Sequence, residues 1–280
     1  IAVPAIGATL LPLPISLGRL ETEDALERSG AKLVIREDDE LATDGDPGDA
    51  PFAEPDPDRV VQIALTSGTT GRSKLASLTA ELKQLTFEGF TTRLGFGPGD
   101  RMLPLSPITQ GAGEMCLYAL RTGATLVMSH HARFEAERAL AQAERTKATV
   151  LGGVPTMVAR MLHCPALERT DLSSLRATIS AGAPLPESVA REWEERTGAP
   201  TCSFYGAMDV GQLAVPSPDD PPEKRWTTVG RPHDRAETLI CNPDGSAVEP
   251  GEDGEICMRG PLVQPKYWGE DETPYSDDGW

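Results

Sequence analysis

Short apolar runs alternate with longer stretches of mixed polar and apolar residues along most of the chain. The runs are rich in Val, Ile and Leu, which is typical of buried strands. They predict strands at residues 10–15, 32–35, 60–65, 101–105, 124–128, 148–151, 176–180 and 201–204. The stretches between them predict helices at residues 21–29, 79–94, 113–121, 135–145, 155–163 and 186–196. Thr79 is the predicted N-cap of the second helix, and Gly30 is the predicted end of the first.

This order of elements predicts an α/β fold. Strands that alternate with helices are joined by crossover connections, so the sheets should be largely parallel and covered by helices. The pattern changes near Ala214, where a segment rich in Pro and Asp precedes short strands at 237–241 and 254–260. We therefore expect an α/β core over residues 1–213, followed by a linker and a C-terminal β-rich subdomain over residues 214–280.

Charge and hydropathy narrow the class of protein. The 280 residues carry a formal net charge of −17, which argues against nucleic acid as a partner because phosphate backbones need a basic surface. Residues 37–58 hold ten carboxylates and no Lys or Arg, which predicts an acidic surface loop.

No run of eighteen apolar residues occurs, so no membrane span is expected. The apolar stretch 1–17 has no basic leader and three prolines, which predicts a strand and a turn, not a signal peptide.

The cysteines are odd in number and scattered, with no CxxC pair and no histidine at ligand spacing. They are Cys116, Cys164, Cys202, Cys241 and Cys257. Such a set predicts reduced thiols and a cytoplasmic protein, and it argues against a zinc site.

The segment LTSGTTGRSK, residues 65–74, follows a predicted strand and concentrates glycine, hydroxyl side chains and a lysine. Glycine lets backbone N–H groups approach an anion closely, hydroxyls add donors, and Lys74 adds a positive charge. The segment therefore predicts a polyphosphate cradle. It is not a Walker A loop, because Ser73 and Leu75 stand where that motif needs a glycine and a magnesium-binding hydroxyl.

The same loop resembles the signature of the AMP-forming adenylating superfamily, which is roughly [ST]SG[ST]TGxPK. Eight of its nine positions fit, and Ser73 replaces the usual proline. Other segments resemble the family in the expected order: ISAGAPLP (179–186), FYGAMDVG (204–211), VGRP (229–232) and GEDGEICMRGP (251–261). The superfamily contains acyl- and aryl-CoA synthetases, the adenylation domains of nonribosomal peptide synthetases, and luciferases. The resemblance covers nearly the whole chain.

The resemblance implies that ATP activates a small-molecule carboxylic acid to an acyl-adenylate with release of pyrophosphate. A thiol of CoA or of a carrier protein then takes the acyl group. The implied phosphate contacts are Thr66, Ser67, Gly68, Thr69, Thr70, Gly71 and Lys74. The implied contacts to the rest of the nucleotide are Gly182, Ala183, Pro184, Tyr205, Gly206 and Met208. Asp209 matches the family carboxylate that binds Mg²⁺. The implied catalytic residues are Lys74 and Asp209.

Several positions depart from the family pattern. Asp209 replaces a glutamate and is one methylene shorter. Met208 replaces a threonine that reaches the α-phosphate, and a thioether cannot donate that hydrogen bond. The segment LPLSPITQG (103–111) lacks the aromatic residue and the histidine that many members use in the acid pocket. Candidate contacts to the acid substrate are Thr109, Gly111, Val154 and Gly182.

Family members have a further N-terminal segment before a stretch like residues 1–17. They also have a hinge and a small lysine-bearing C-terminal domain after a run like YSDDGW (275–280). We therefore expect this chain to correspond to the middle of such an enzyme.

Three hypotheses stay open. The chain belongs to an acid–thiol ligase, to a degenerate module that binds nucleotide or acyl-adenylate without turnover, or, with the least support, to the P-loop NTPases.

Overall fold

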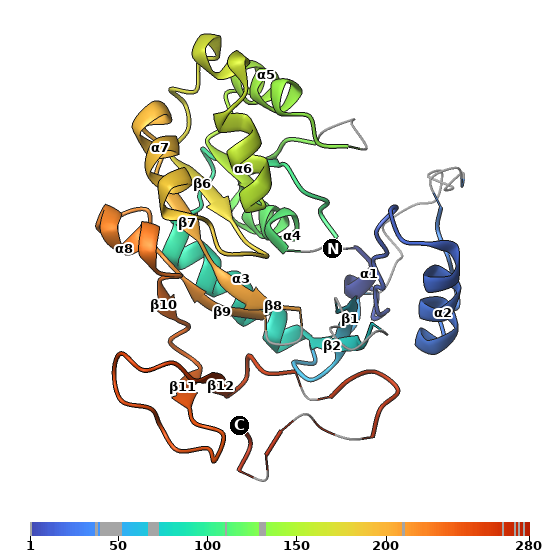
Figure 1. The fold of residues 1–280 in the computed structure, drawn as a ribbon. Helices are drawn as coiled ribbons and strands as arrows, with labels where there is room; N and C mark the ends of the chain where they lie inside the picture. The colour runs from blue at the N-terminus through green and yellow to red at the C-terminus, as the bar shows by residue number, and fades with distance from the viewer. Residues whose placement is uncertain are drawn as a thin grey trace. The chain divides into compact units, whose positions relative to one another are not determined.

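The computed structural model describes residues 2–36, 39, 52–66, 73–109, 111–128, 133–208, 211–264, 266–271, 273, 275–276 and 278–280. The chain forms two compact units, and Figure 1 shows its elements in order. One unit consists of residues 1–83 and 264–279, and the other of residues 84–263 with Trp280. These units are defined by contacts and not by function, so the functional division between residues 213 and 214 stays a prediction.

The first unit holds helices α1 (Ala2–Ala5) and α2 (Arg19–Ser29) and the antiparallel strands β1 (Val60–Leu65) and β2 (Leu75–Thr79). Helix α2 ends where Gly30 adopts a φ of 66°, the left-handed conformation that glycine favours. Strands β1 and β2 pair in a register that sets Leu65 opposite Leu75, so they form a hairpin around the glycine loop.

Two strands predicted in this unit are wrong. Leu10 forms a single parallel bridge with Gln62, and the strand predicted at 10–15 does not continue because Pro12 and Pro14 have no N–H to donate. Residues 32–35 form no strand; Leu33 is 78% exposed, so an apolar run did not indicate burial. The acidic loop predicted at 37–58 lies largely outside the described residues. Only residues 39 and 52–58 of this loop are described.

The second unit is built on a five-stranded parallel sheet in the order β4-β3-β5-β6-β7. Its strands are β3 (Arg101–Pro104), β4 (Thr125–Leu126), β5 (Val150–Gly153), β6 (Ala177–Ser180) and β7 (Thr201–Ser203). The helices are α3 (Ala80–Leu94), α4 (Gly111–Tyr118), α5 (Ala136–Thr146), α6 (Pro155–Leu162) and α7 (Glu187–Thr197). Two 3-10 helices, η2 (Ala119–Thr122) and η3 (Pro165–Arg169), complete the connections. The predicted α/β fold with a largely parallel sheet is confirmed.

Helices cover both faces of this sheet because successive strand residues point to opposite sides. One core cluster joins strand residues to α3 and α4 and includes Met102, Val150, Phe90 and Met115. The other joins the alternate strand residues to α5, α6 and α7 and includes Leu103, Leu151, Leu140, Val158 and Trp193. The short apolar runs that form β3, β5, β6 and β7 are therefore strands largely buried on both faces.

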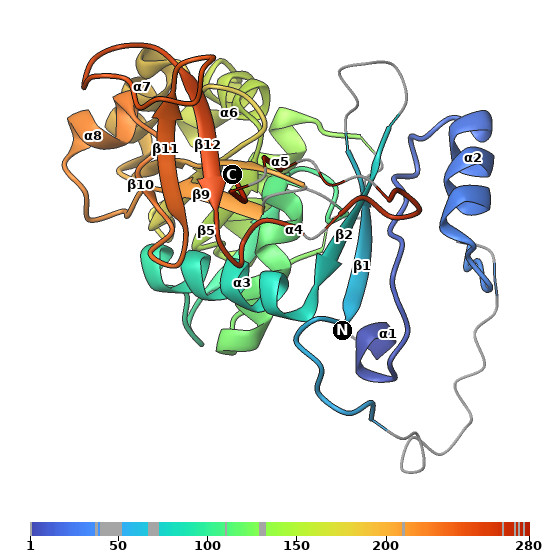
Figure 2. The ribbon, with the colours of Figure 1, turned by 90° about the horizontal axis from the view of Figure 1, so that it is seen from below.

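The remaining strands of the second unit pair in antiparallel fashion. Strands β8 (Tyr205–Ala207), β9 (Gly211–Val215) and β10 (Arg231–Pro232) form one small sheet, and helix α8 (Pro222–Thr227) connects β9 to β10. Strands β11 (Glu237–Cys241) and β12 (Glu255–Arg259) run side by side in a second sheet (Figure 2). The sequence predicted β11 and β12 and missed β8 to β10. Strands β8 and β10 are only three and two residues long, and β9 begins at Gly211.

The prediction that all five cysteines are reduced is wrong for one pair. Cys241 and Cys257 form a disulfide, with their Cα atoms 6.7 Å apart. The physical reason is the antiparallel pairing of β11 with β12, which sets Leu239 opposite Cys257 and Cys241 opposite Glu255 and so makes the two cysteines diagonal neighbours. Cys116, Cys164 and Cys202 are free thiols.

Candidate functional site

The two ends of the glycine loop are tied together at the tip of the β1–β2 hairpin. The backbone N–H of Lys74 donates to Oγ1 of Thr66 (3.1 Å), and the backbone N–H of Thr66 donates to the carbonyl of Lys74 (3.0 Å). Residues 67–72, which include the predicted phosphate contacts Ser67, Gly68, Thr69, Thr70 and Gly71, lie outside the described residues. The structure therefore fixes where this loop begins and ends.

The side chain of Lys74 lies over an aromatic ring that the sequence did not single out. Its Nζ is 4.3 Å from the centroid of the Tyr267 ring, and Tyr267 is only 8% exposed. An ammonium at this distance from a ring face is attracted by the ring's negative face. No local signal in the sequence could have revealed this contact, because the two residues are far apart along the chain.

The segment of residues 182–184, which is predicted to contact the nucleotide, follows strand β6. Its start is anchored by Ser180, whose carbonyl accepts from the N–H of Phe204 (3.0 Å), and by Ala181, whose N–H donates to Gly153 (3.2 Å). Gly182 then adopts a φ of 87°, in the left-handed region. Residues 182–184 are exposed, whereas Ala181 and Leu185 on either side are buried. The segment is a short stretch of exposed backbone between two buried anchors.

Tyr205 follows strand β7, which is the hydrogen-bonded neighbour of β6. Its side chain is 44% exposed, and Gly206 beside it is exposed as well. Met208 lies in the turn after β8, and Asp209 lies outside the described residues. Because the carboxyl ends of parallel strands meet at one edge, Gly182 and Tyr205 follow neighbouring strands at the same edge of the sheet.

The candidate acid contacts also follow strands at this edge. The chain runs outward from β3 to β4 and then in the other direction from β5 to β7, so the strand order reverses between β3 and β5. Ligands of open parallel sheets bind at the carboxyl ends of the strands at such a reversal. Thr109 and Gly111 follow β3, and Val154 is the N-cap residue of α6 directly after β5.

The structure brings two of these candidates together. A Cβ built on Gly182 would lie 3.8 Å from Cγ1 of Val154, so these two positions are neighbours. Three hydroxyl oxygens along the same edge, those of Ser106, Thr109 and Ser180, are buried without a hydrogen-bond partner in the part of the chain that the structure describes. Buried polar atoms are usually paired, so these hydroxyls are candidates for bonding to a ligand or to water.

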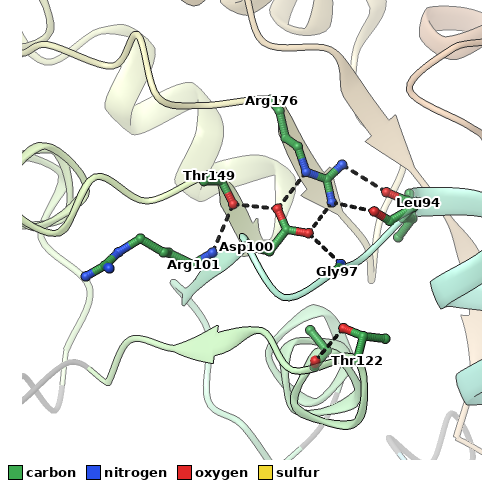
Figure 3. A network of polar contacts seen from close by, with 9 residues as sticks. Leu94, Gly97, Asp100, Arg101, Thr122, Thr149 and Arg176 are labelled. Carbon is green, nitrogen blue, oxygen red and sulfur yellow. Dashed lines mark hydrogen bonds and ion pairs between the residues drawn. The ribbon is translucent and has the colours of Figure 1, made fainter.

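A network of polar contacts lies at the opposite edge, where the strands begin (Figure 3). Asp100 precedes β3 and accepts from Arg176 (2.6 Å), from the hydroxyl of Thr149 (2.7 Å) and from the N–H of Gly97 (2.9 Å). Arg176 also donates to the carbonyl of Leu94 (2.9 Å). Burial raises the pKa of Asp100, but the hydrogen bonds from Arg176, Thr149 and Gly97 outweigh it and hold this pKa below its usual range. The network ties the starts of β3, β5 and β6 together and has a structural role.

Among the described residues we find no metal cluster, and the two fully buried free thiols are unreactive. Within the described ranges, no group of three or more His, Cys, Asp or Glu side chains could hold a metal ion. Burial raises the pKa of the Cys116 and Cys202 thiols to about 12, so both stay protonated and are poor nucleophiles. As far as the description of the chain extends, none of its helices has the length and apolar character needed to cross a bilayer.

One known family matches most of this chain. The family model described as AMP-binding enzyme matches residues 1–268. The chain belongs to the AMP-binding enzyme family. The AMP-binding match spans every nucleotide contact predicted from the sequence, from Thr66 to Asp209, but it assigns no role to any single residue.

Individual AMP-binding relatives are similar over most of this chain. A feruloyl-CoA synthase of Amycolatopsis sp. is 29% identical over 298 residues, which cover 98% of this chain and 60% of the relative. An indoleacetate–CoA ligase of Aromatoleum aromaticum is 30% identical over 239 residues, which cover 83% of this chain and 46% of the relative. A solved malonyl-CoA ligase with methylmalonyl-CoA and AMP bound is 25% identical, with a TM-score of 0.83 over 99% of this chain and 63% of its own.

The chain spans about 60% of the length of the curated relative that it matches over 98% of its own residues. Family and fold are therefore established for the residues present. The activity, substrates and partners of a whole enzyme are matters for proposal.

Proposed function

We propose that this chain holds the nucleotide and acid sites of a ligase that activates a carboxylic acid with ATP. The reaction forms an acyl-adenylate and pyrophosphate, and the acyl group then passes to CoA. The observation that carries the proposal is the carboxyl edge of the parallel sheet, where the exposed backbone of residues 182–184 and the half-exposed ring of Tyr205 follow neighbouring strands. A flat backbone surface and an aromatic ring suit the two faces of a purine.

The β1–β2 hairpin carries the residues to which we assign the phosphates of ATP. Thr66 and Lys74 hold the ends of the glycine loop, and Lys74 offers a positive charge to the β- and γ-phosphates. Attack of a carboxylate on the α-phosphorus needs neutralisation of phosphate charge more than it needs a covalent nucleophile. Substitution of Lys74 by Ala should therefore weaken ATP binding by about 1–3 kcal/mol, as expected for the loss of a charge-assisted contact.

An aromatic acid is the substrate class that we propose. The two relatives described above are named for feruloyl and indoleacetate groups, which are aromatic. Ferulate also carries a phenol, and the buried, unpartnered hydroxyls of Ser106 and Thr109 after β3 could bond to such a polar substituent. Val154, a candidate acid contact, lies beside Gly182, which we assign to both the acid and the nucleotide.

The proposal also includes a metal ion and an acyl acceptor. Mg²⁺ would be held by Asp209, which lies outside the described residues, so we derive no step through the metal. CoA as the acceptor is supported by the names of the relatives, and loading of a carrier protein is the alternative. Met208, Ser73 and Pro107 depart from the family pattern and favour the second candidate, a module that binds acyl-adenylate without turnover. The cytoplasmic location stays a prediction.

Two measurements test the proposal. Isothermal titration with sulfamoyl analogues of feruloyl-, indoleacetyl- and related aryl-adenylates should show binding of at least one of them to this chain, and no binding of any would contradict both the ligase and the binding module. Exchange of labelled pyrophosphate into ATP, measured on the full-length protein that contains the chain, should depend on ferulate, indole-3-acetate or a related aryl acid. Binding of an analogue without exchange for any acid in the panel would favour the binding module.

A further inference from the structure

Gln264, Tyr267 and Trp268 contact strand β2 in the unit that contains the glycine hairpin. The side-chain oxygen of Gln264, which is 1% exposed, accepts from the N–H of Ser77 (2.9 Å). Tyr267 forms an antiparallel bridge with Ala76, and the N–H of Trp268 donates to the carbonyl of Leu75 (2.7 Å). This segment therefore follows β2 toward the loop and ends beside Lys74.

The C-terminal end of helix α2 holds the same part of the hairpin from a second direction. Nη1 of Arg28 donates to the carbonyl of Ser73 (2.8 Å) and lies 3.2 Å from Oδ2 of Asp24. The indole N–H of Trp268 donates to the carbonyl of Ser29 (3.2 Å), which links the segment to α2. The backbone on both sides of Lys74 is thus fixed by groups outside the hairpin.

The ring of Tyr267 extends this support to the side chain of Lys74. The ring is nearly buried and its backbone is bridged to β2, so its position is set by the fold. The exposed ammonium of Lys74 lies over the ring at 4.3 Å. An ammonium has three N–H donors, and a ring face takes up only one side of the group, so donors remain free for an anion.

We propose that Tyr267 is a positioning residue that holds the ammonium of Lys74 ready for the triphosphate of ATP. The inference rests on the proposed function, because it assumes that Lys74 binds the β- and γ-phosphates. A lysine side chain has several rotatable bonds, and ordering them opposes binding. A ring that holds the ammonium before ATP arrives removes part of that cost.

The test compares ATP with AMP on three variants. Tyr267→Leu removes the ring and should weaken ATP binding about three- to tenfold, while AMP, which has no β- or γ-phosphate, should bind as it does to the wild type. Tyr267→Phe keeps the ring and should leave both affinities unchanged. Lys266→Ala is the matched control, because it removes an exposed positive charge from the same segment and should also leave both unchanged. Isothermal titration measures each affinity.

Folding could fail in Tyr267→Leu, so a second series keeps the size of the ring. Phenylalanine analogues with increasing fluorination at position 267 weaken the ring's attraction for a cation and conserve its volume. Affinity for ATP should fall stepwise along this series, with AMP affinity constant. Equal ATP affinity across the series, or tighter ATP binding as the ring weakens, would overturn the inference.

A spectroscopic readout tests the contact without any nucleotide. After reductive methylation with ¹³C, the Lys74 resonance should be shifted upfield by the Tyr267 ring, and Lys74→Ala identifies it by its loss. Tyr267→Leu should return it to the position of exposed lysines, and an unshifted resonance in the wild type would overturn the inference.

The Lys74→Ala variant separates the two proposals. If Lys74→Ala weakens ATP binding and the loss of the ring does not, the positioning role is wrong and the proposed function stands. If Lys74→Ala leaves ATP affinity unchanged, the assigned phosphate role of Lys74 is wrong, and the positioning role is wrong with it.

Discussion

Gly182 is the residue whose backbone most constrains the candidate nucleotide site. Its φ of 87° lies in a region that L side chains rarely adopt, and it opens the exposed segment between the buried Ala181 and Leu185. The space around it is not crowded, since a Cβ would meet only Val154 at an ordinary contact distance. The need for glycine at this position is therefore conformational.

A matched pair of substitutions tests this interpretation. Gly198, the C-cap of α7, has a similar φ of 71° and lies outside the candidate site. Gly182→Ala and Gly198→Ala should each lower the free energy of unfolding by about 1–2 kcal/mol, because both force a side chain into the left-handed region. Only Gly182→Ala should also weaken ATP binding severalfold. Equal loss of ATP affinity in both variants would indicate a general effect of destabilisation, and no loss in either would remove Gly182 from the site.

At the scale of elements, the parallel sheet depends on the polar network at its starting edge. Asp100 is 7% exposed and receives hydrogen bonds from residues that precede β5 and β6. Loss of a partner leaves a buried charge unpaired, which costs more than the net value of the bond. This network should therefore contribute to the stability of the sheet in a pH-dependent way.

The sign of that pH dependence follows from the lowered pKa of Asp100. A carboxyl whose pKa is lower in the folded state stabilises the fold above its ordinary pKa of about 4, and this contribution disappears as the pH falls through the lower, folded value. Asp100→Asn should lower the free energy of unfolding by about 1–3 kcal/mol at pH 7. The difference between the variant and the wild type should shrink below pH ~4. Urea denaturation at several pH values measures it, and a difference that stays constant with pH would contradict the assignment.

At the scale of the whole molecule, the sequence predicted the central fold well. The helices and strands between residues 101 and 203 were recovered because β3, β5, β6 and β7 are largely buried on both faces and helices separate the successive strands. The wrong and missed strands all lie outside the parallel sheet, where an apolar run does not indicate a buried strand. Apolar residues at 32–35 are exposed, prolines stop the strand at 10–15, and β8 and β10 are too short to leave a pattern.

The candidate site could be predicted only in part. The residues after β6 and β7 lie where the parallel sheet requires, and the ends of the glycine loop meet at a hairpin. The contact of Lys74 with Tyr267 and the network around Asp100 join residues distant in sequence, so no local pattern could have indicated them. The disulfide between Cys241 and Cys257 was also missed, because it depends on how β11 pairs with β12.

The net charge of −17 makes a prediction for the molecule as a whole. Repulsion between like charges destabilises a compact state, and salt screens it over about 10 Å at 0.1 M ionic strength. The melting temperature should therefore rise by a few degrees from low to moderate NaCl, and equally with KCl. The rise should be smaller at pH 5, where more carboxylates are protonated. A melting temperature that falls with salt would show that screened ion pairs outweigh the repulsion.

The polar network and the proposed ligand contacts lie at opposite edges of the parallel sheet, and this determines which substitutions the fold can tolerate. Asp100, Thr149 and Arg176 keep the strands in register from one end, and none of them lies where ligand contacts are proposed. Substitutions at 106, 109 and 154 can thus alter the preferred acid while the scaffold persists. A variant library confined to those positions should contain mostly folded proteins, which makes this edge a practical starting point for redesigning selectivity.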